Sequence, residues 1–127
     1  MHGIRTISDS EQSPTWERVQ ERLLALKHEK TLTLDVDDDT FLIVLFTEPV
    51  GYLVSGCGVG DKDWHTLIDR SLGDDIVTAF DGGDTRSFPR YVFVDAPLLL
   101  KAMETYYRTG ERDRTCEWVE TDQTFYD

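Results

Sequence analysis

The first regular pattern along the chain is a row of apolar residues spaced three and four positions apart. The row consists of Trp16, Val19, Leu23 and Leu26, and most of the positions between them are polar or charged. This spacing places the apolar side chains on one face of a helix. Because Ser13 is a suitable N-cap and Pro14 suits the first helical position, the pattern predicts an amphipathic helix over residues 14–29.

Strand patterns follow the first helix. Apolar and β-branched residues alternate or run together over 31–36, 41–46, 52–55, 76–80 and 91–94, and Trp118 indicates a short edge strand over 115–119. The breaks between these runs at 37–39, 48–51 and 81–84 are short, which favours antiparallel pairing. Residues 64–72 are expected to form a short helical turn or an irregular loop.

A second amphipathic helix is expected between Asp95 and Gly110. Asp95 is a suitable cap, Pro97 lies in the first turn, and Gly110 suits the left-handed position that ends a helix. The apolar stripe of this helix consists of Leu98, Leu99, Ala102, Met103 and Tyr106.

These elements predict an α+β fold with a mainly antiparallel sheet of five or six strands, packed with two amphipathic helices. The pattern leaves open whether the helices share one face of the sheet or cover one face each. The polar residues 1–12 are expected to form a flexible N-terminal arm, and residues 13–127 a single domain.

The net charge narrows the possible partners. The chain of 127 residues carries 25 acidic and 13 basic residues, a net charge of −12, and the excess is −6 in each half. Such a protein repels nucleic acid and anionic membrane surfaces and attracts a basic protein. We find no apolar run of about 20 residues and no export signal, so we expect a cytoplasmic protein.

Two motifs resemble ligand sites only in part. Asp35, Asp37 and Asp39 have the spacing of the first calcium ligands in a calcium loop, but Thr40 and Phe46 stand where the loop needs Gly and Glu. The glycine-rich stretch 56–60 lacks the spacing of a dinucleotide fingerprint and is followed by two aspartates. We therefore expect no metal and no cofactor.

Catalysis has an equally weak signature. Cys57 and His65 are a nucleophile and a base in principle, but neither an orienting group nor an oxyanion site accompanies them. Cys57 and Cys116 have no metal-binding or redox spacing, and we expect both to stay reduced. The sequence therefore indicates a protein that is not an enzyme.

The second half of the chain resembles a known family. The resemblance rests on the order of these features: Phe80-Asp81-Gly82-Gly83-Asp84, Phe88-Pro89-Arg90-Tyr91-Val92-Phe93-Val94, Ala96, Ala102, Tyr106-Tyr107, Gly110 and Trp118. In this order they are similar to immunity protein family one of bacterial polymorphic toxin systems. The first half matches more loosely, through Trp16 in the opening helix and the strand near Tyr52. The resemblance covers roughly residues 14–120.

The resemblance implies an antitoxin for interbacterial competition, which binds the toxin domain encoded beside it. Toxins linked to the family are mostly enzymes that act on nucleic acid, with cytosine-deaminase-like domains prominent among them. The charge of −12 suits such a partner, because an enzyme of this kind usually presents a basic groove. The motif residues themselves have the character of turn, cap and core positions, so no family interface is carried over.

We expect the partner to be bound by acids and one aromatic residue on loops and strand ends. These candidates are Asp37, Asp38, Asp39, Asp61, Asp63, Trp64, Asp81 and Asp84. The carboxylates would pair with toxin Arg and Lys, while Trp64 would be an apolar anchor. The alternative for each acid is a solvated turn, and for Trp64 a place in a small satellite core. Self-association, an acidic adaptor module for an unrelated basic partner, and a small enzyme using Cys57 remain open.

Overall fold

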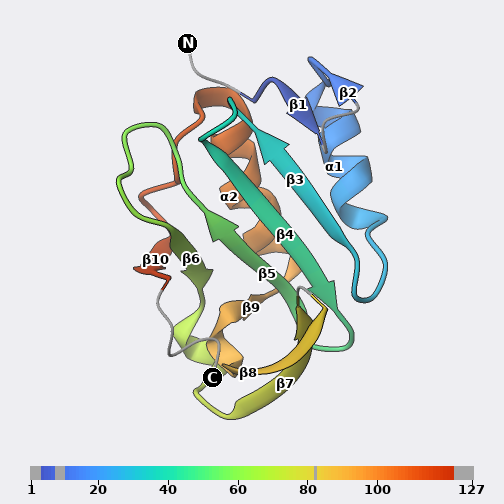
Figure 1. Ribbon diagram of the computed structural model, residues 1–127, viewed down its shortest axis with the longest axis vertical. Helices are drawn as coiled ribbons and strands as arrows, with labels where there is room; N and C mark the ends of the chain where they lie inside the picture. The colour runs from blue at the N-terminus through green and yellow to red at the C-terminus, as the bar shows by residue number, and fades with distance from the viewer. Residues whose placement is uncertain (1–3, 8–10, 82, 122–127) are drawn as a thin grey trace.

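The computed structural model describes residues 4–7, 11–81 and 83–121. Its elements in chain order are β1 (Thr6–Ile7), β2 (Glu11–Gln12), α1 (Trp16–Leu24), β3 (Thr31–Asp35), β4 (Phe41–Thr47), β5 (Gly51–Gly56), β6 (His65–Ile68), η1 (Arg70–Leu72), β7 (Ile76–Asp81), β8 (Asp84–Pro89), η2 (Arg90–Val92), β9 (Phe93–Val94), α2 (Ala96–Thr109) and β10 (Glu117–Glu120). Figure 1 shows a central sheet with α2 behind it and the β7–β8 hairpin toward its lower end. The predicted α+β class is confirmed.

The central sheet has eight strands in the order β10-β6-β5-β4-β3-β1-β2, with β9 pairing alongside β5. All of its pairings are antiparallel. The longest ladders of this sheet join β3 to β4 and β4 to β5. β7 and β8 pair only with each other and form a second, two-stranded sheet.

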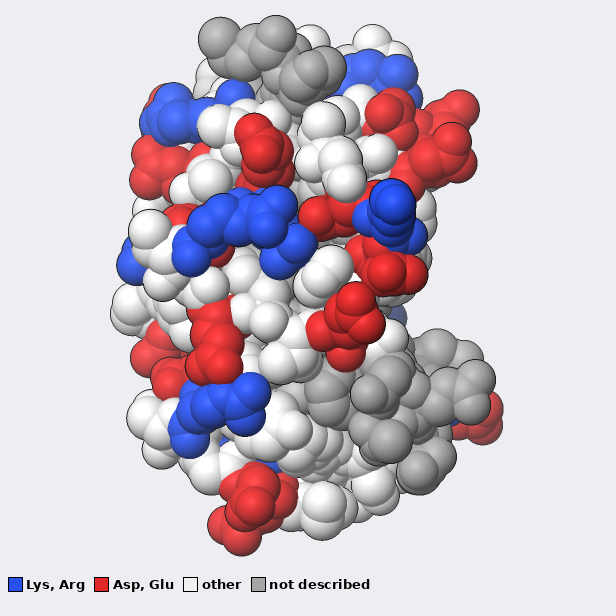
Figure 2. Space-filling model, turned by 90° about the vertical axis from the view of Figure 1, so that its left-hand side faces the viewer, with Lys and Arg blue, Asp and Glu red and all other residues white. Residues whose placement is uncertain are grey.

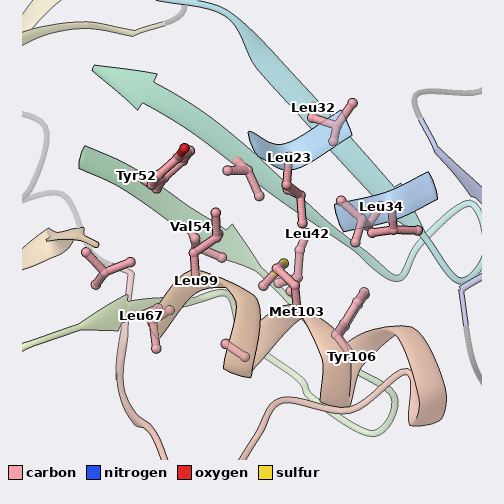
Figure 3. Close-up of a cluster of buried hydrophobic side chains, with 14 of the residues drawn as sticks. Leu23, Leu32, Leu34, Leu42, Tyr52, Val54, Leu67, Leu99, Met103 and Tyr106 are labelled. Carbon is pink, nitrogen blue, oxygen red and sulfur yellow. The ribbon is translucent and has the colours of Figure 1, made fainter. Parts of the chain in front are cut away.

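Both helices cover the same face of the central sheet, which settles the arrangement that the sequence left open. The main core contains Val19 and Leu23 of α1 together with Leu99, Met103 and Tyr106 of α2, all fully buried. Figure 3 shows the helical side chains of Leu23, Leu99 and Met103 among strand residues such as Leu32, Leu42, Val54 and Leu67. Strand residues that alternate with these point to the opposite face.

The opposite face of the sheet is covered over only part of its length. Leu45 and Leu53, which pair across β4 and β5, pack in a second core with Ala79 and Phe88 of the β7–β8 hairpin. Toward the other end of β4, Phe41 and Ile43 share this face but are only half-buried. In Figure 1 that end of β3 and β4 lies at the top of the sheet, away from the hairpin.

The main sheet has more strands than the five or six expected. The predicted loose arm is wrong for Thr6 and Ile7, which pair with β3, and Ile7 is completely buried because it fills the core beside Leu34. Residues 1–3 and 8–10 of that arm lie outside the described part. His65–Ile68, expected in a turn or loop, is a strand held between β5 and β10. A 3-10 turn follows at Arg70–Leu72.

The first helix is shorter than predicted and the second begins and ends as expected. Thr15, not Ser13, caps α1 by accepting from the Arg18 amide. The helix ends at Leu24 with Ala25 as its C-cap, and Glu29 and Lys30 then form backbone hydrogen bonds with Phe46. In α2, Asp95 accepts from the Leu98 amide and Gly110 adopts φ 74°.

Candidate functional site

The β3–β4 turn presents three consecutive aspartates to solvent. The side chains of Asp37, Asp38 and Asp39 are exposed, and the Asp38 carboxylate lies 3.7 Å from Nη2 of Arg5. The Asp39 amide donates to the Asp37 carboxylate at 2.9 Å, and this hydrogen bond is the main cause that lowers the pKa of Asp37. The turn is thus held in part by a hydrogen bond from its own backbone to Asp37.

A hollow of about 300 Å³ lies beside this turn on the partly covered face of the sheet. Its lining is Arg5, Thr33, Asp35, Asp37, Asp38 and Phe41. The strand register explains how these residues meet, because Asp35 pairs with Phe41 across β3 and β4. The Asp35 carboxylate also accepts from the Thr6 hydroxyl at 3.1 Å. The hollow is therefore polar except for one aromatic wall.

The β5–β6 loop places Trp64, the aromatic candidate, against Phe41 at the edge of this hollow. The Trp64 ring meets the Phe41 ring edge-to-face, with centroids 5.5 Å apart, and 39% of Trp64 remains exposed. Asp63 precedes it and is exposed. The structure thus joins two groups of candidates that are distant in the sequence. We call their shared region the Phe41 surface: Thr33, Asp35, Asp37, Asp38, Asp39, Phe41, Ile43, Asp63 and Trp64.

Asp61 has a different environment from the other candidates. Its side chain is 6% exposed, and Arg112, itself 8% exposed, donates to both carboxylate oxygens at 2.6 and 2.9 Å. The Gly58 amide donates a third hydrogen bond at 2.8 Å. Burial by itself raises the pKa of Asp61, but Arg112 and the Gly58 amide outweigh it and hold the pKa below its usual value. Asp61 therefore holds the loop through contacts inside the protein.

The last two candidates lie on the β7–β8 hairpin. Asp84 begins β8 and is exposed, and Asp81 ends β7, but its side chain lies outside the described part. The hairpin packs over the end of the sheet away from the β3–β4 turn (Figure 1). Asp84 is therefore separate from the Phe41 surface.

Sequence reasoning missed the residues that hold the β5–β6 loop in place. Arg112 and Asp113 are both buried, although they follow the helix end in a polar stretch. Asp113 accepts from Thr105 and Thr115, and its carbonyl accepts from the Trp118 indole at 3.0 Å. Arg112, two positions after the glycine that ends the helix, gave no local signal, because its partner Asp61 is 51 positions away.

Cys57, the nucleophile of the enzyme alternative, is buried and hydrogen-bonded to the backbone. The Cys57 thiol is buried and donates to the Asp39 carbonyl, whereas His65 Nδ1 lies 2.9 Å from the Asp63 carbonyl. Cys57 and Cys116 are both free thiols. Among residues 4–7, 11–81 and 83–121, no group of three or more His, Cys, Asp or Glu side chains is placed to hold a metal ion.

Acidic and basic side chains are interspersed over much of the molecule. Figure 2 views the side that carries β10, where both signs alternate, while acidic side chains gather at the upper right. A larger hollow of about 510 Å³ between β6, β10 and α2 includes Arg70 and Lys101 as well as Asp69, Asp95 and Glu117. In the described part of the chain, neither helix has the length and apolarity needed to cross a membrane.

The comparisons with known proteins agree with the resemblance that the sequence motifs carry. A family model described as "Immunity protein Imm1" matches residues 5–120, which is most of the chain. Neither the curated proteins nor the solved structures gave a match. The matched range includes β1, both helices and the late strand β10. The chain therefore belongs to the Imm1 family of immunity proteins.

Proposed function

We propose that this immunity protein neutralises a toxin domain that acts on nucleic acid, a deaminase- or nuclease-like enzyme, by covering its basic active-site cleft in the cytoplasm. Membership of the Imm1 family supports a cognate toxin as the partner. The net charge of −12 is the observation that favours a basic cleft, because it attracts a cationic protein and repels the nucleic acid that such a cleft binds. The protein acts by occlusion and supplies no catalytic group.

Exposed acids and one aromatic residue form the contact in this proposal. They are Asp37, Asp38, Asp39, Asp63, Trp64, Asp81 and Asp84, the expected set without Asp61. Asp61 is left out because Arg112 already occupies both of its carboxylate oxygens. In the described part of the chain, the carboxylates of Asp39, Asp63 and Asp84 form no ion pair, so they can pair with a partner without breaking an internal contact.

The test is a binding and inhibition assay with the toxin domain encoded beside this gene. We expect a complex that forms at about 50 mM salt and associates more slowly at about 300 mM salt, because salt screens attraction between exposed charges. The toxin's activity on nucleic acid should fall as the immunity protein is added, with one protein inhibiting one toxin domain. A toxin domain that remains fully active in excess immunity protein would disprove the proposal.

The alternative of a small enzyme using Cys57 makes a different prediction. The Cys57 thiol is 7% exposed and donates to a backbone carbonyl, which suits a structural residue. If protection depended on cysteine chemistry, Cys57→Ser would abolish it even when the protein folds. Under occlusion, a folded Cys57→Ser variant protects cells as well as the original protein does.

A further inference from the structure

We propose that the Phe41 surface is where the toxin docks, and that the hollow beside Phe41 receives an arginine side chain of the toxin. This inference rests on the proposed function, and it names one surface and one kind of contact within it. It excludes the helical face, the β10 edge and the β7–β8 hairpin as the centre of the interface. The occupant is a cationic loop of the toxin domain.

The partly covered end of the sheet supports this location. On the helical side, the sheet residues belong to a core whose members are buried. On the other side, the hairpin buries Leu45 and Leu53, but Phe41 and Ile43 are only half-buried. An aromatic ring on the β5–β6 loop, Trp64, extends the apolar area at this end. Partly exposed aromatic residues surrounded by polar groups are typical anchors of protein interfaces.

Local charge determines what this surface attracts. The Phe41 surface contains five carboxylates, from Asp35, the β3–β4 turn and Asp63, whereas the basic residues beside it are Arg5 and Lys62. The larger hollow near α2 is nearly balanced, because Arg70 and Lys101 line it together with three acids. Since complementary charge guides association and suppresses wrong partners, the Phe41 surface suits a cationic loop better.

The shape and lining of the hollow favour arginine. About 300 Å³ lies at the lower limit of small-molecule pockets, so it fits a single side chain rather than a ligand of larger size. A guanidinium stacks on an aromatic ring such as Phe41 and donates several hydrogen bonds in one plane to carboxylates such as Asp37 and Asp38. A lysine offers only a point charge, with neither the planar stacking surface nor the paired donors.

Arg5 shows that a guanidinium is tolerated at this place. It lines the hollow, and its Nη2 atom lies 3.7 Å from Asp38 Oδ1. Both side chains of this pair are largely exposed, at 58% and 101%. An exposed pair of this kind contributes little, so an incoming arginine can displace it. Arg5 should therefore compete with the toxin rather than help it.

The experiment measures how tightly the neighbouring toxin domain binds, and how fast it dissociates, for the original protein and three variants. Asp38→Lys tests the hollow, and Asp74→Lys is its control, because Asp74 is also exposed and each change alters the net charge by +2. Asp74 lies between η1 and β7, at the end of the sheet away from the β3–β4 turn (Figure 1). The third variant is Arg5→Gln, which removes the cation beside the hollow. Thermal melts confirm that each variant folds.

We expect Asp38→Lys to weaken binding at least about 10-fold, mainly through faster dissociation, and Asp74→Lys to weaken it less than about 3-fold through slower association. Arg5→Gln should tighten binding, because it removes the competing cation. Equal losses for Asp38→Lys and Asp74→Lys, with the original protein still binding, overturn this inference and leave the proposed function intact. If the original protein does not bind the toxin domain, the proposed function fails and this inference fails with it.

Discussion

The pairing of Asp61 with Arg112 makes a sharp prediction, because it decides whether a candidate binding residue is structural. Asp61→Ala removes the acceptor of two hydrogen bonds from Arg112 and one from the Gly58 amide. The guanidinium of Arg112 would then stay buried against the Trp118 ring, whose centroid lies 5.6 Å away. Arg114, whose Nη2 atom lies 3.7 Å from Asp61, is exposed and is itself a cation, so it cannot accept the hydrogen bonds that Arg112 loses.

The expected loss of stability is large for a single substitution. Removing one partner of a buried ion pair costs about 3–5 kcal/mol, since it leaves a buried charge uncompensated. Both side chains qualify as buried, with exposures of 6% and 8%. For a domain of this size, such a loss lowers Tm by about 10–20 °C. The loss is a large part of the roughly 5–15 kcal/mol that stabilises a typical domain.

The assay is chemical and thermal unfolding of four variants. Asp63→Ala is the matched control, because Asp63 is an exposed aspartate two positions away and its loss should change stability by less than about 0.5 kcal/mol. Arg112→Met alone should also be destabilising, while the double variant Asp61→Ala, Arg112→Met should cost clearly less than the sum of the single changes. If Asp61→Ala melts within about 3 °C of the original protein, Asp61 has no structural role and the reasoning is wrong.

The same pair predicts a dependence of stability on pH. The pKa of Asp61 lies below its ordinary value of 3.8 in the folded protein, despite burial that opposes this shift, because of Arg112 and the Gly58 amide. A lowered pKa stabilises the folded state above the ordinary value, and this stabilisation is lost as the pH falls through the folded value. The difference in unfolding free energy between the original protein and Asp61→Asn should therefore stay constant above about pH 5 and shrink as the pH falls from about pH 5 to about pH 3. A difference that stays constant over this range would contradict the direction of the shift.

Three further substitutions test the surroundings of the Phe41 surface. Tyr106→Phe removes the hydrogen bond from the Tyr106 hydroxyl to the Cys57 carbonyl, 2.8 Å long, and should cost about 1–3 kcal/mol in denaturant unfolding because a buried acceptor is left unpaired. Gly56→Ala should lower Tm strongly, because a Cβ there would lie 2.2 Å from the Phe41 carbonyl oxygen at φ +147°. Trp64→Ala should reduce stability by only about 1 kcal/mol yet weaken toxin binding at least about 10-fold, as measured by calorimetry. Unchanged affinity in a folded Trp64→Ala variant would remove this residue from the interface.

Periodicity predicted the elements whose stabilising contacts are local. The second helix begins at Asp95 and ends at Gly110 as expected, because its cap and its left-handed end are both set by adjacent residues. The β3 strand was predicted from its alternation of apolar and polar residues, and the β4 strand from a continuous run of apolar residues. The features that define these elements lie within a few consecutive residues, so the sequence alone reveals them.

Elements that depend on distant partners were missed. Thr6 and Ile7 lie in a polar stretch and become a strand only because β3 supplies the pairing and the core has room for Ile7. β6 lies in a stretch expected to form a short helical turn or an irregular loop, yet its backbone pairs with β5 and β10. Tertiary pairing decides the structure of such short segments, and a local pattern cannot reveal it.

The candidate site likewise combines features that the local sequence predicts with features that depend on distant residues. Exposure of the β3–β4 turn was predictable, because consecutive aspartates between two strands favour a solvated reversal. Asp61 and Asp63, both in one loop and both acidic, could not be told apart from the sequence. One is buried against Arg112 and the other is exposed, since only the fold brings residue 112 to the loop.

The buried aspartate also determines how the exposed residues can work. Asp61 and the hydrogen bond from the Val59 amide to the Gly110 carbonyl tie the β5–β6 loop to the end of α2. That loop carries Trp64 to the Phe41 ring, so the apolar part of the proposed interface is held in place before a partner arrives. Preorganisation of this kind reduces the entropy lost on binding. The charges that are paired inside the protein thus contribute to affinity indirectly, by fixing the position of the groups that remain available.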